Sequence, residues 1–343
     1  MGINGLFSFL KKKFPSLFET VHFSQFRGKS FAIDVSGLIW KFKVVNPTKW
    51  LDSFAYFIFA LRQNQIHPIF VYDGKAPVEK EKEKLRRNEQ RVKLINKTEQ
   101  LREDLDKYYN EGEASELLLE KSKELKPNTL ANVVQTQLLE QKYQQMKTQI
   151  NNFTDEDRKK LQQLFDLAGV PTVTSPSEAE TLCASLYHEK KVDAVVSGDS
   201  DVCAYQVENF LYEINHFNHT AIKVSFSRLL QALELTPTQF VDFCILCGTD
   251  YNDNIPKVGP VNAYKLIKEC GSIEKIGEKG YDISILNHQV VRGLFQPRHS
   301  VSVETVCRAP NTVELYNFLV MNNSRISFET IQKAYAPPVL IFE

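Results

Sequence analysis

Seven carboxylates carry the clearest chemical signal in this 343-residue sequence. Three of them, Asp34, Asp73 and Asp199, each end a short apolar segment. The other four are Asp201, Glu178, Glu180 and Asp250. Two bare carboxylates about 4 Å apart repel by about 4 kcal/mol at a protein-like effective dielectric, so a cluster of them needs protons or cations. Oxygen ligands without nearby His or Cys favour Mg²⁺ or Mn²⁺ over zinc, and two such ions suit in-line attack on a phosphodiester.

Each acid taken alone also has a structural interpretation. An Asp at a strand end often caps the next helix or turn. The segments 175–178 and 177–180 both match the Ser-x-x-Glu capping box. Glu178 and Glu180 are two residues apart and diverge on a helix, so they would serve different metals, or one would act through water. The set as a whole favours a metal site over separate caps. A phosphatase of the haloacid dehalogenase type needs Asp-x-Asp after the first strand, where this sequence has Asp34–Val35–Ser36, and no P-loop lysine motif occurs.

Short strands alternate with helices around these acids. The apolar segments that end in Asp are 30–34, 66–73 and 192–199. Helical patterns fall at 49–62, 154–168 and 177–190. This alternation predicts an α/β fold with a mostly parallel central sheet flanked by helices. Ligands of such sheets bind beyond the carboxyl ends of the strands, which is where the three strand-end acids fall.

The overall composition excludes some classes of protein and leaves others open. Lys plus Arg and Asp plus Glu both number 42, so any surface for nucleic acid must be a local patch. No apolar run is long enough to span a membrane, and the first residues lack a secretion signal, which predicts an intracellular protein, nuclear or cytoplasmic. The six cysteines include one Cys-x-x-Cys, at Cys244 and Cys247, and are expected to be free, buried thiols rather than zinc ligands.

Residues 78–150 differ from the rest of the chain. They are rich in Lys, Glu, Gln and Leu, and they predict two or three long helices interrupted near 126–128. Four basic residues are spaced to share one helix face, namely Lys80, Lys84, Arg87 and Arg91. Interleaved glutamates leave open a solvated, salt-bridged helix. The stripe follows Asp73 closely, so a cationic face beside the acids would draw a phosphate chain toward them.

Several ordered motifs resemble those of the flap endonucleases of the XPG-type 5′-nuclease family. They are Met1–Gly2–Ile3 with Gly5–Leu6, Arg27–Gly28–Lys29, Ala32–Ile33–Asp34–Val35–Ser36, Val71–Tyr72–Asp73–Gly74–Lys75, Gly169–Val170–Pro171, Ser175–Pro176–Ser177–Glu178–Ala179–Glu180, Asp199–Ser200–Asp201, Leu246–Cys247–Gly248–Thr249–Asp250–Tyr251 and Val258–Gly259–Pro260. They are spread in order over residues 1–270, and together they are specific although each alone is weak.

The resemblance implies a PIN-like nuclease core built from residues 1–77 and 154–227. It implies a helical gateway and arch at 78–153, and a region 228–343 that contains a helix–two-turn–helix element at 242–270. All seven acids would hold two Mg²⁺ ions, with Mn²⁺ as a substitute. Lys80 and Arg87 would act as catalytic residues that direct the phosphate.

The resemblance also implies a set of DNA contacts. They are Gly2, Trp40, Lys84, Arg91, Lys257 and Gly259. Trp40 takes the place of a Tyr that stacks on the terminal base, although a core Trp is the alternative. The helix–two-turn–helix would grip duplex phosphates, usually with a K⁺ ion. Here Lys257 replaces the first glycine of the Gly-x-Gly-Pro-Lys turn and Val261 replaces its lysine, which leaves the turn geometry and the K⁺ site open.

The function expected from these residues is a metal-dependent, structure-specific 5′ nuclease that hydrolyses DNA near junctions of single and double strands, in replication, repair or recombination. Alternatives are an exonuclease or four-way-junction resolvase of the same family, a non-catalytic DNA-junction-binding relative, and an RNA-cutting PIN-type nuclease. The complete acid set favours catalysis. The expected partner is branched or flapped DNA bound by a monomer. No sliding-clamp peptide of the Gln-x-x-hydrophobic-x-x-aromatic-aromatic kind occurs in the C-terminal part.

Overall fold

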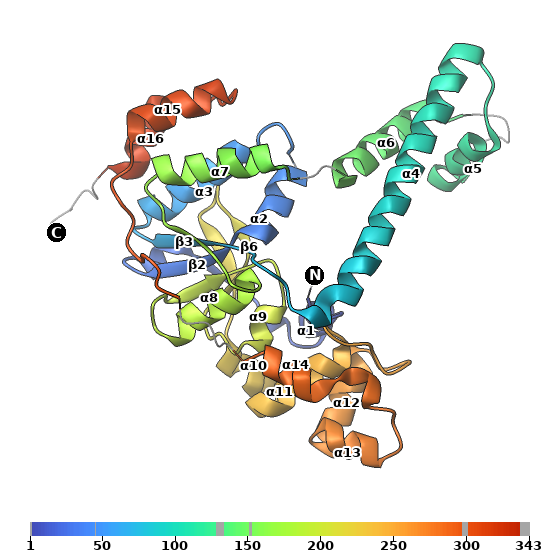
Figure 1. The fold of residues 1–343 in the computed structure, drawn as a ribbon, viewed down its shortest axis with the longest axis vertical. Helices are drawn as coiled ribbons and strands as arrows, with labels where there is room; N and C mark the ends of the chain where they lie inside the picture. The colour runs from blue at the N-terminus through green and yellow to red at the C-terminus, as the bar shows by residue number, and fades with distance from the viewer. Residues whose placement is uncertain (1, 45, 128–133, 151–152, 297–300, 337–343) are drawn as a thin grey trace.

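A seven-stranded sheet forms the centre of the protein in this computed structural model (Figure 1). The structure describes residues 2–44, 46–127, 134–150, 153–296 and 301–336. In spatial order the strands are β1 (Glu19–His22), β7 (Thr220–Val224), β6 (Phe210–Asn215), β5 (Ala194–Val196), β2 (Ser30–Asp34), β3 (His67–Tyr72) and β4 (Thr172–Thr174). Neighbours from β6 to β4 are parallel, whereas β7 and β1 pair antiparallel. The mostly parallel α/β sheet predicted from the sequence is therefore confirmed.

Helices cover both faces of this sheet, as its near-continuous apolar strands require. On β2, Phe31 and Ile33 belong to one core and Ala32 to the other, because successive side chains of a strand point to opposite faces. Figure 1 shows one face beneath α3 (Trp50–Gln63) and α7 (Asp155–Leu167). The other face packs against α1 (Leu6–Lys13), α8 (Ala179–His188) and α9 (Asp201–Ala204).

The predicted strands and helices agree with the structure except at their ends. The third strand is shorter than 192–199, and β5 stops three residues before Asp199. This leaves a loop that carries the acid out of the sheet. A capping box between Thr154 and Asp157 starts α7. The strands β1, β4, β6 and β7 were not anticipated from the sequence.

Two helices near the C-terminus return to the sheet and cover its first face. They are α15 (Thr312–Met321) and α16 (Phe328–Tyr335), which pack on α7 and α3 respectively. Tyr335 donates a hydrogen bond to the carbonyl oxygen of Ala168 at 3.1 Å. The weak sequence pattern after residue 277 gave no sign of this return. Residues 337–343, interpreted from the sequence as part of a tail, lie outside the described residues.

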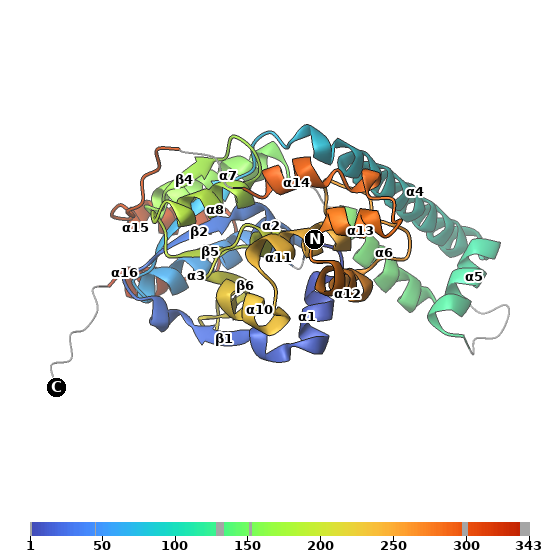
Figure 2. The ribbon, with the colours of Figure 1, turned by 90° about the horizontal axis from the view of Figure 1, so that it is seen from below.

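The predicted insertion is a helical arm that projects from the body of the protein (Figures 1 and 2). It consists of α4 (Glu81–Glu111), α5 (Glu116–Leu125) and α6 (Thr136–Ile150). The expected interruption begins where α5 ends at Leu125, and residue 128 lies outside the described residues. The arm has a small core of its own, formed by Leu101, Leu105, Leu118, Leu139 and Met146. Its distal part is therefore held together by its own apolar contacts.

A second group of helices lies below the sheet in Figure 1. It consists of α10 (Phe226–Leu233), α11 (Pro237–Cys247), α12 (Pro260–Cys270), α13 (Ile273–Glu278) and α14 (His288–Leu294). The pair α11 and α12 covers the region 242–270, where a helix–two-turn–helix element is expected, and its helices pack against each other. Its first helix begins earlier, at Pro237, because Thr236 and Gln239 form a capping box there.

Two further expectations concern the cysteines and membrane-spanning helices. All six cysteines are free; five are buried and Cys307 is partly buried, which confirms that Cys244 and Cys247 are buried thiols. Within the described ranges, no helix combines the length and the apolar character needed to cross a membrane.

Candidate active site

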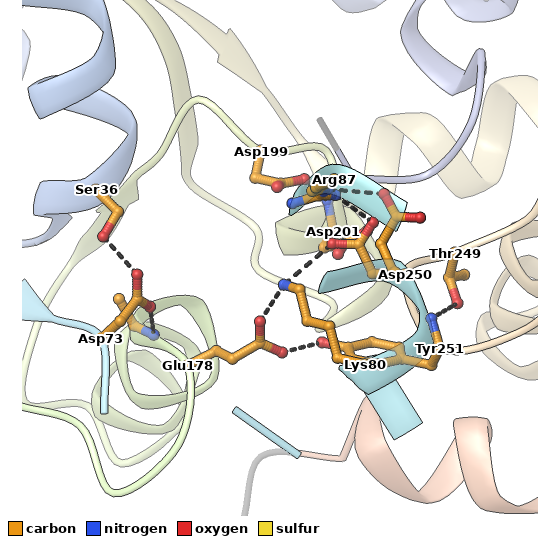
Figure 3. Close-up of polar contacts among 12 residues, drawn as sticks. Ser36, Asp73, Lys80, Arg87, Glu178, Asp199, Asp201, Thr249, Asp250 and Tyr251 are labelled. Atoms are coloured by element: carbon orange, nitrogen blue, oxygen red, sulfur yellow. Dashed lines mark hydrogen bonds and ion pairs between the residues drawn. The ribbon is translucent and has the colours of Figure 1, made fainter. Parts of the chain in front are cut away.

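The seven predicted acids lie around the carboxyl ends of neighbouring strands and the adjoining helix ends. Asp34 ends β2, Asp73 follows β3, and Asp199 follows β5. Glu178 and Glu180 are at the start of α8, Asp201 starts α9, and Asp250 follows α11. The charge of Asp34 acts on Glu180, and the charges of Asp199 and Asp250 act on Asp201. The fold therefore gathers the set into one electrostatically linked region, part of which Figure 3 shows.

One half of this region contains Asp34, Asp73 and Glu180. Asp34 is buried and accepts hydrogen bonds from the Ser36 amide at 2.9 Å and the Ser197 hydroxyl at 3.0 Å. Asp73 accepts from the Ser36 hydroxyl at 2.5 Å and from the amide at the first residue of α8 at 2.8 Å. No lysine or arginine in the described parts of the chain forms an ion pair with these three acids.

These acids lack a basic partner among the described residues, and the pKa values of two of them are raised. Burial, followed by the charge of Asp73, raises the pKa of Asp34 to about 7. Burial, followed by the charge of Asp34, raises the pKa of Glu180 well above its usual value. Both pKa values are raised because the ionised form of each acid is a buried charge beside like charges. A cation at this half of the site would favour the ionised forms and would therefore oppose both shifts.

The other half contains Glu178 and Asp250, and here two basic residues form ion pairs with the acids (Figure 3). The Lys80 ammonium contacts Glu178 and lies 3.0 Å from Asp250 Oδ2. Arg87 Nη2 donates to Asp250 Oδ1 at 2.7 Å, and its Nε donates to Glu83 at 2.7 Å. Burial opposes the charge on Lys80, but Glu178 and Asp250 outweigh it and raise the pKa of Lys80 above its ordinary value.

Asp199 and Asp201 complete the set with oxygens that are only partly satisfied. Asp199 Oδ1 accepts from the Asp201 amide at 3.1 Å. Asp201 Oδ1 is buried without a hydrogen-bond partner among the described residues, and so is Asp250 Oδ2, whose contact with Lys80 lacks hydrogen-bond geometry. Burial first, and the charge of Asp199 second, raise the pKa of Asp201. An unpaired buried carboxylate oxygen is costly unless a ligand completes it.

The donor chemistry of the region fits hard divalent cations. Its side-chain donors are carboxylate oxygens, the ligands that Mg²⁺ and Mn²⁺ prefer. Within the described residues, no three His, Cys, Asp or Glu side chains already surround a common ion position. One reason is that Lys80 and Arg87 hold Glu178 and Asp250 in ion pairs.

Tyr251 is a member of this region that reasoning from the sequence did not assign a role. Its hydroxyl donates a hydrogen bond to Glu178 Oε2 at 2.5 Å, opposite the oxygen that Lys80 contacts. Its ring packs edge-on against Phe295, with centroids 5.7 Å apart. The only signal in the sequence was its position directly after Asp250. The buried tyrosine fixes the orientation of Glu178.

Gly2 lies beside the acids, as the resemblance implied. Its backbone has a φ of 86°, a conformation that favours glycine. A Cβ atom added there would lie 1.7 Å from Asp199 Oδ1. Position 2 therefore admits no side chain unless Asp199 moves.

The other predicted DNA contacts are at the surface or at helix ends. Trp40 is 58% exposed at the start of a π-helical turn (Trp40–Val44), so the core alternative is wrong. Lys84 and Arg91 are exposed on α4. Lys80 precedes this helix in a 3₁₀ turn (Val78–Lys80), so the four basic residues do not share one continuous α-helix.

In the turn before α12, the residue at the expected glycine position has a left-handed backbone conformation. Lys257 has a φ of 65°, and its carbonyl oxygen accepts a hydrogen bond from Asn262 at 2.9 Å. Gly259 is the N-cap of α12, with open space where a Cβ would be. A glycine-like backbone at this turn is therefore compatible with lysine, at a conformational cost of about 1–2 kcal/mol.

Comparison with known proteins supports the same interpretation. Residues 1–94 match the XPG N-terminal domain and residues 169–250 match the XPG I-region. A probable RAD2-like endonuclease of Invertebrate iridescent virus 6 is 33% identical over 328 residues, covering 86% of this chain and 79% of that protein. Flap endonuclease 1 of Scheffersomyces stipitis is 30% identical over 295 residues, covering 81% of this chain and 69% of that protein.

The fold also matches a solved nuclease structure. The catalytic core of Rad2 in complex with a DNA substrate superposes with a TM-score of 0.64 at 19% identity, covering 95% of this chain and 97% of that one. This likeness confirms the PIN-like core, and the family models and relatives agree with it. The chain belongs to the XPG-type flap endonuclease family of structure-specific 5′ nucleases.

Proposed function

We propose that this protein hydrolyses DNA phosphodiesters next to junctions of single and double strands, in replication, repair or recombination. The observation that carries the proposal is the direct contact of Lys80 and Arg87 with Glu178 and Asp250, two of the clustered acids. Acids alone would repel a phosphate chain, and basic residues alone would bind it without cutting. Their combination favours hydrolysis over non-catalytic junction binding.

All seven acids are proposed to hold two Mg²⁺ ions, with Mn²⁺ as a substitute. Bound cations of this kind supply hydroxide at neutral pH and offset the negative charge that develops on the phosphate. Ser36 and Ser197 orient Asp34 through hydrogen bonds, and Tyr251 orients Glu178. These neighbours fix where the donor oxygens point before substrate arrives.

Lys80 and Arg87 are proposed to exchange partners when DNA binds. Without substrate they neutralise Glu178 and Asp250. A scissile phosphate offers the same two cations an anionic oxygen, and charge-assisted hydrogen bonds to phosphate are strong. Transfer of Lys80 and Arg87 to the phosphate would stabilise its developing charge and release the two acids as metal ligands.

The remaining contacts are proposed to align the DNA. Lys257 and Gly259 lie at the turn before α12, whose backbone amides suit a duplex phosphate, and this turn is also the candidate K⁺ site. Trp40 offers an exposed ring for a terminal base, while Lys84 and Arg91 on α4 attract the single strand. The partner is proposed to be branched or flapped DNA, bound by a monomer.

A substrate panel tests this proposal. Purified protein would be incubated with Mg²⁺ and a 5′-flap, a gapped duplex, a blunt duplex or a four-way junction, each also prepared with RNA in the cut strand. We expect the 5′-flap DNA to be cut fastest, with activity lost in EDTA and restored by Mg²⁺. Binding of the flap without cutting would make the protein a non-catalytic junction binder, and preference for another substrate would identify the alternative nuclease activity.

A further inference from the structure

The helices α1 and α12 border a surface slot that the nuclease chemistry does not use. Figures 1 and 2 show the two helices side by side. The slot has a volume of about 620 Å³. Its apolar lining comes mainly from Phe9, Pro260, Val261 and Tyr264. Val261 is 56% exposed, so its side chain is available to a ligand in the slot.

Three lysines form the rim of this slot. Lys12 and Lys13 come from α1 and Lys265 comes from α12, and all three are exposed. Among the residues that the structure describes, no Asp or Glu lines the slot and no carboxylate forms an ion pair with these lysines. The slot therefore combines an apolar floor with uncompensated positive charge.

Neighbouring lysines on the same helices behave differently. Lys11 lies 3.1 Å from Glu213, and Lys268 lies 2.7 Å from Glu234. The absence of acids is thus specific to the lysines around the slot and is not a property of α1 and α12 as a whole. A ligand with negative charge would complete the rim.

Nucleic acid is the less suitable ligand because the slot offers no free aromatic face. The Lys13 ammonium lies 4.3 Å from the centroid of the Tyr264 ring, and the Tyr264 hydroxyl donates to the Leu233 carbonyl at 3.0 Å. Phe9 is buried, with its ring 5.6 Å from that of Tyr264. Base stacking needs an exposed ring, and phosphates gain nothing from an apolar floor. A peptide with an apolar side chain between acidic residues matches both parts of the slot.

We propose that this slot docks an acidic peptide segment of another protein. One large apolar side chain of that segment enters between Pro260 and Val261, and its flanking carboxylates contact Lys12, Lys13 and Lys265. Buried apolar anchors surrounded by a polar rim are the usual source of affinity in such interfaces. Gly5 also lines the slot, three residues from the Gly2 that meets Asp199. The docked partner would therefore sit beside the nuclease site and leave the acids open.

Fluorescence anisotropy with defined peptides tests the proposal. The probes are short fluorescein-labelled peptides with acidic residues on both sides of a phenylalanine or a leucine, and a matched peptide with alanine at that position. We expect a phenylalanine or leucine peptide to bind at least about tenfold more tightly than the alanine peptide, a difference of about 1.4 kcal/mol. Val261→Glu is expected to abolish this preference, and Lys265→Ala to weaken binding several-fold.

The matched control is Lys268→Ala, which removes a lysine of the same helix outside the slot and should leave peptide affinity unchanged. Thermal unfolding of each variant checks that the fold is intact, and Lys12→Ala provides a second test on the other helix. Equal binding of all three peptides, or no binding of any, would overturn the proposal. So would an equal loss of flap-DNA affinity in Val261→Glu and Lys265→Ala with no effect on the peptides, since the slot would then be a DNA contact.

Discussion

Asp242 and Asp201 are both buried carboxylates, yet the protein satisfies them in opposite ways. Asp242 is 1% exposed and accepts hydrogen bonds from Arg292 at 2.6 and 2.7 Å and from the Ile273 amide at 3.2 Å. Asp201 is 4% exposed, and one of its oxygens has no partner among the described residues. A buried charge that only supports the fold is paired on all sides. Acids that are left incomplete, with raised pKa values, indicate where a ligand is expected.

The largest expected effect comes from removing one incomplete acid. Asp199→Asn keeps the shape of the side chain and removes its charge. We expect single-turnover cleavage of a 5′-flap to fall by about a thousandfold or more, because several kcal/mol of transition-state stabilisation depend on the cations it helps to hold. Flap binding and the free energy of unfolding should change little, since repulsion among the acids is relieved.

Asp193→Asn is the matched control at the other end of the same strand. Asp193 accepts hydrogen bonds from Lys29 and from the Ser30 amide, at 3.0 and 2.9 Å, and is therefore a structural acid. Its variant should cut at the wild-type rate. Equal loss of cleavage in both variants would remove the distinction between the two kinds of acid.

Arg292→Ala tests the fully paired acid. It leaves Asp242 buried without its cation, so we expect the free energy of unfolding to fall by about 3 kcal/mol or more. The residual folded protein, assayed at low temperature, should still cut the flap at nearly the wild-type rate. Urea unfolding measures the first effect, and a stability equal to that of the wild type would contradict it.

Lys80→Ala removes a cation with two roles. Lys80 neutralises acids of the site when DNA is absent, and it is proposed to contact the scissile phosphate when DNA binds. We expect the rate of cleavage to fall by about a hundredfold, in the range found when one charge-stabilising donor is lost. Lys82→Ala is the control, since Lys82 is exposed and pairs with Asp253, which is not one of the seven acids. If Lys82→Ala reduced the rate as much as Lys80→Ala, the effect would reflect general charge on the arm.

Tyr251→Phe is expected to have the smallest effect of the series. It removes one hydrogen bond to Glu178 and keeps the ring that packs on Phe295. A hydrogen bond to a charged group contributes about 1.5–3 kcal/mol, so we expect roughly a tenfold decrease in kcat with little change in KM. An unchanged kcat would show that Glu178 does not need this orientation, whereas a raised KM alone would indicate a role in binding.

The sequence predicted the acids better than it predicted their partners. Strand-end positions placed Asp34, Asp73 and Asp199 at one edge of the sheet because side-chain periodicity and strand direction are local properties. The pairing of Lys80 with Glu178 joins residues 98 positions apart and depends on how α4 leaves the body. The hydroxyl of Tyr251 reaches Glu178 for the same kind of reason. Such contacts are set by tertiary packing, which no local pattern contains.

Elements that pack against residues far away in the sequence were also not predicted. The sheet edge formed by β1 and β7 pairs residues about two hundred positions apart, such as Val21 and Ala221. The helix α16 packs on α3 although the sequence pattern after residue 277 was too weak to predict it. In contrast, the helices of the arm were visible from composition and spacing, because they contact mostly their own neighbours. Local order could be predicted, and long-range contacts could not.

Thermal unfolding with and without Mn²⁺ tests the central claim most directly, because it requires neither DNA nor turnover. If the incomplete acids form a cation site, Mn²⁺ should stabilise the wild-type protein in a saturable way, by about 2.7 kcal/mol at a concentration a hundredfold above the dissociation constant. Asp201→Asn should lose most of this stabilisation, whereas Asp193→Asn should keep it. Absence of stabilisation in the wild type, or an equal stabilisation in all three proteins, would contradict the account.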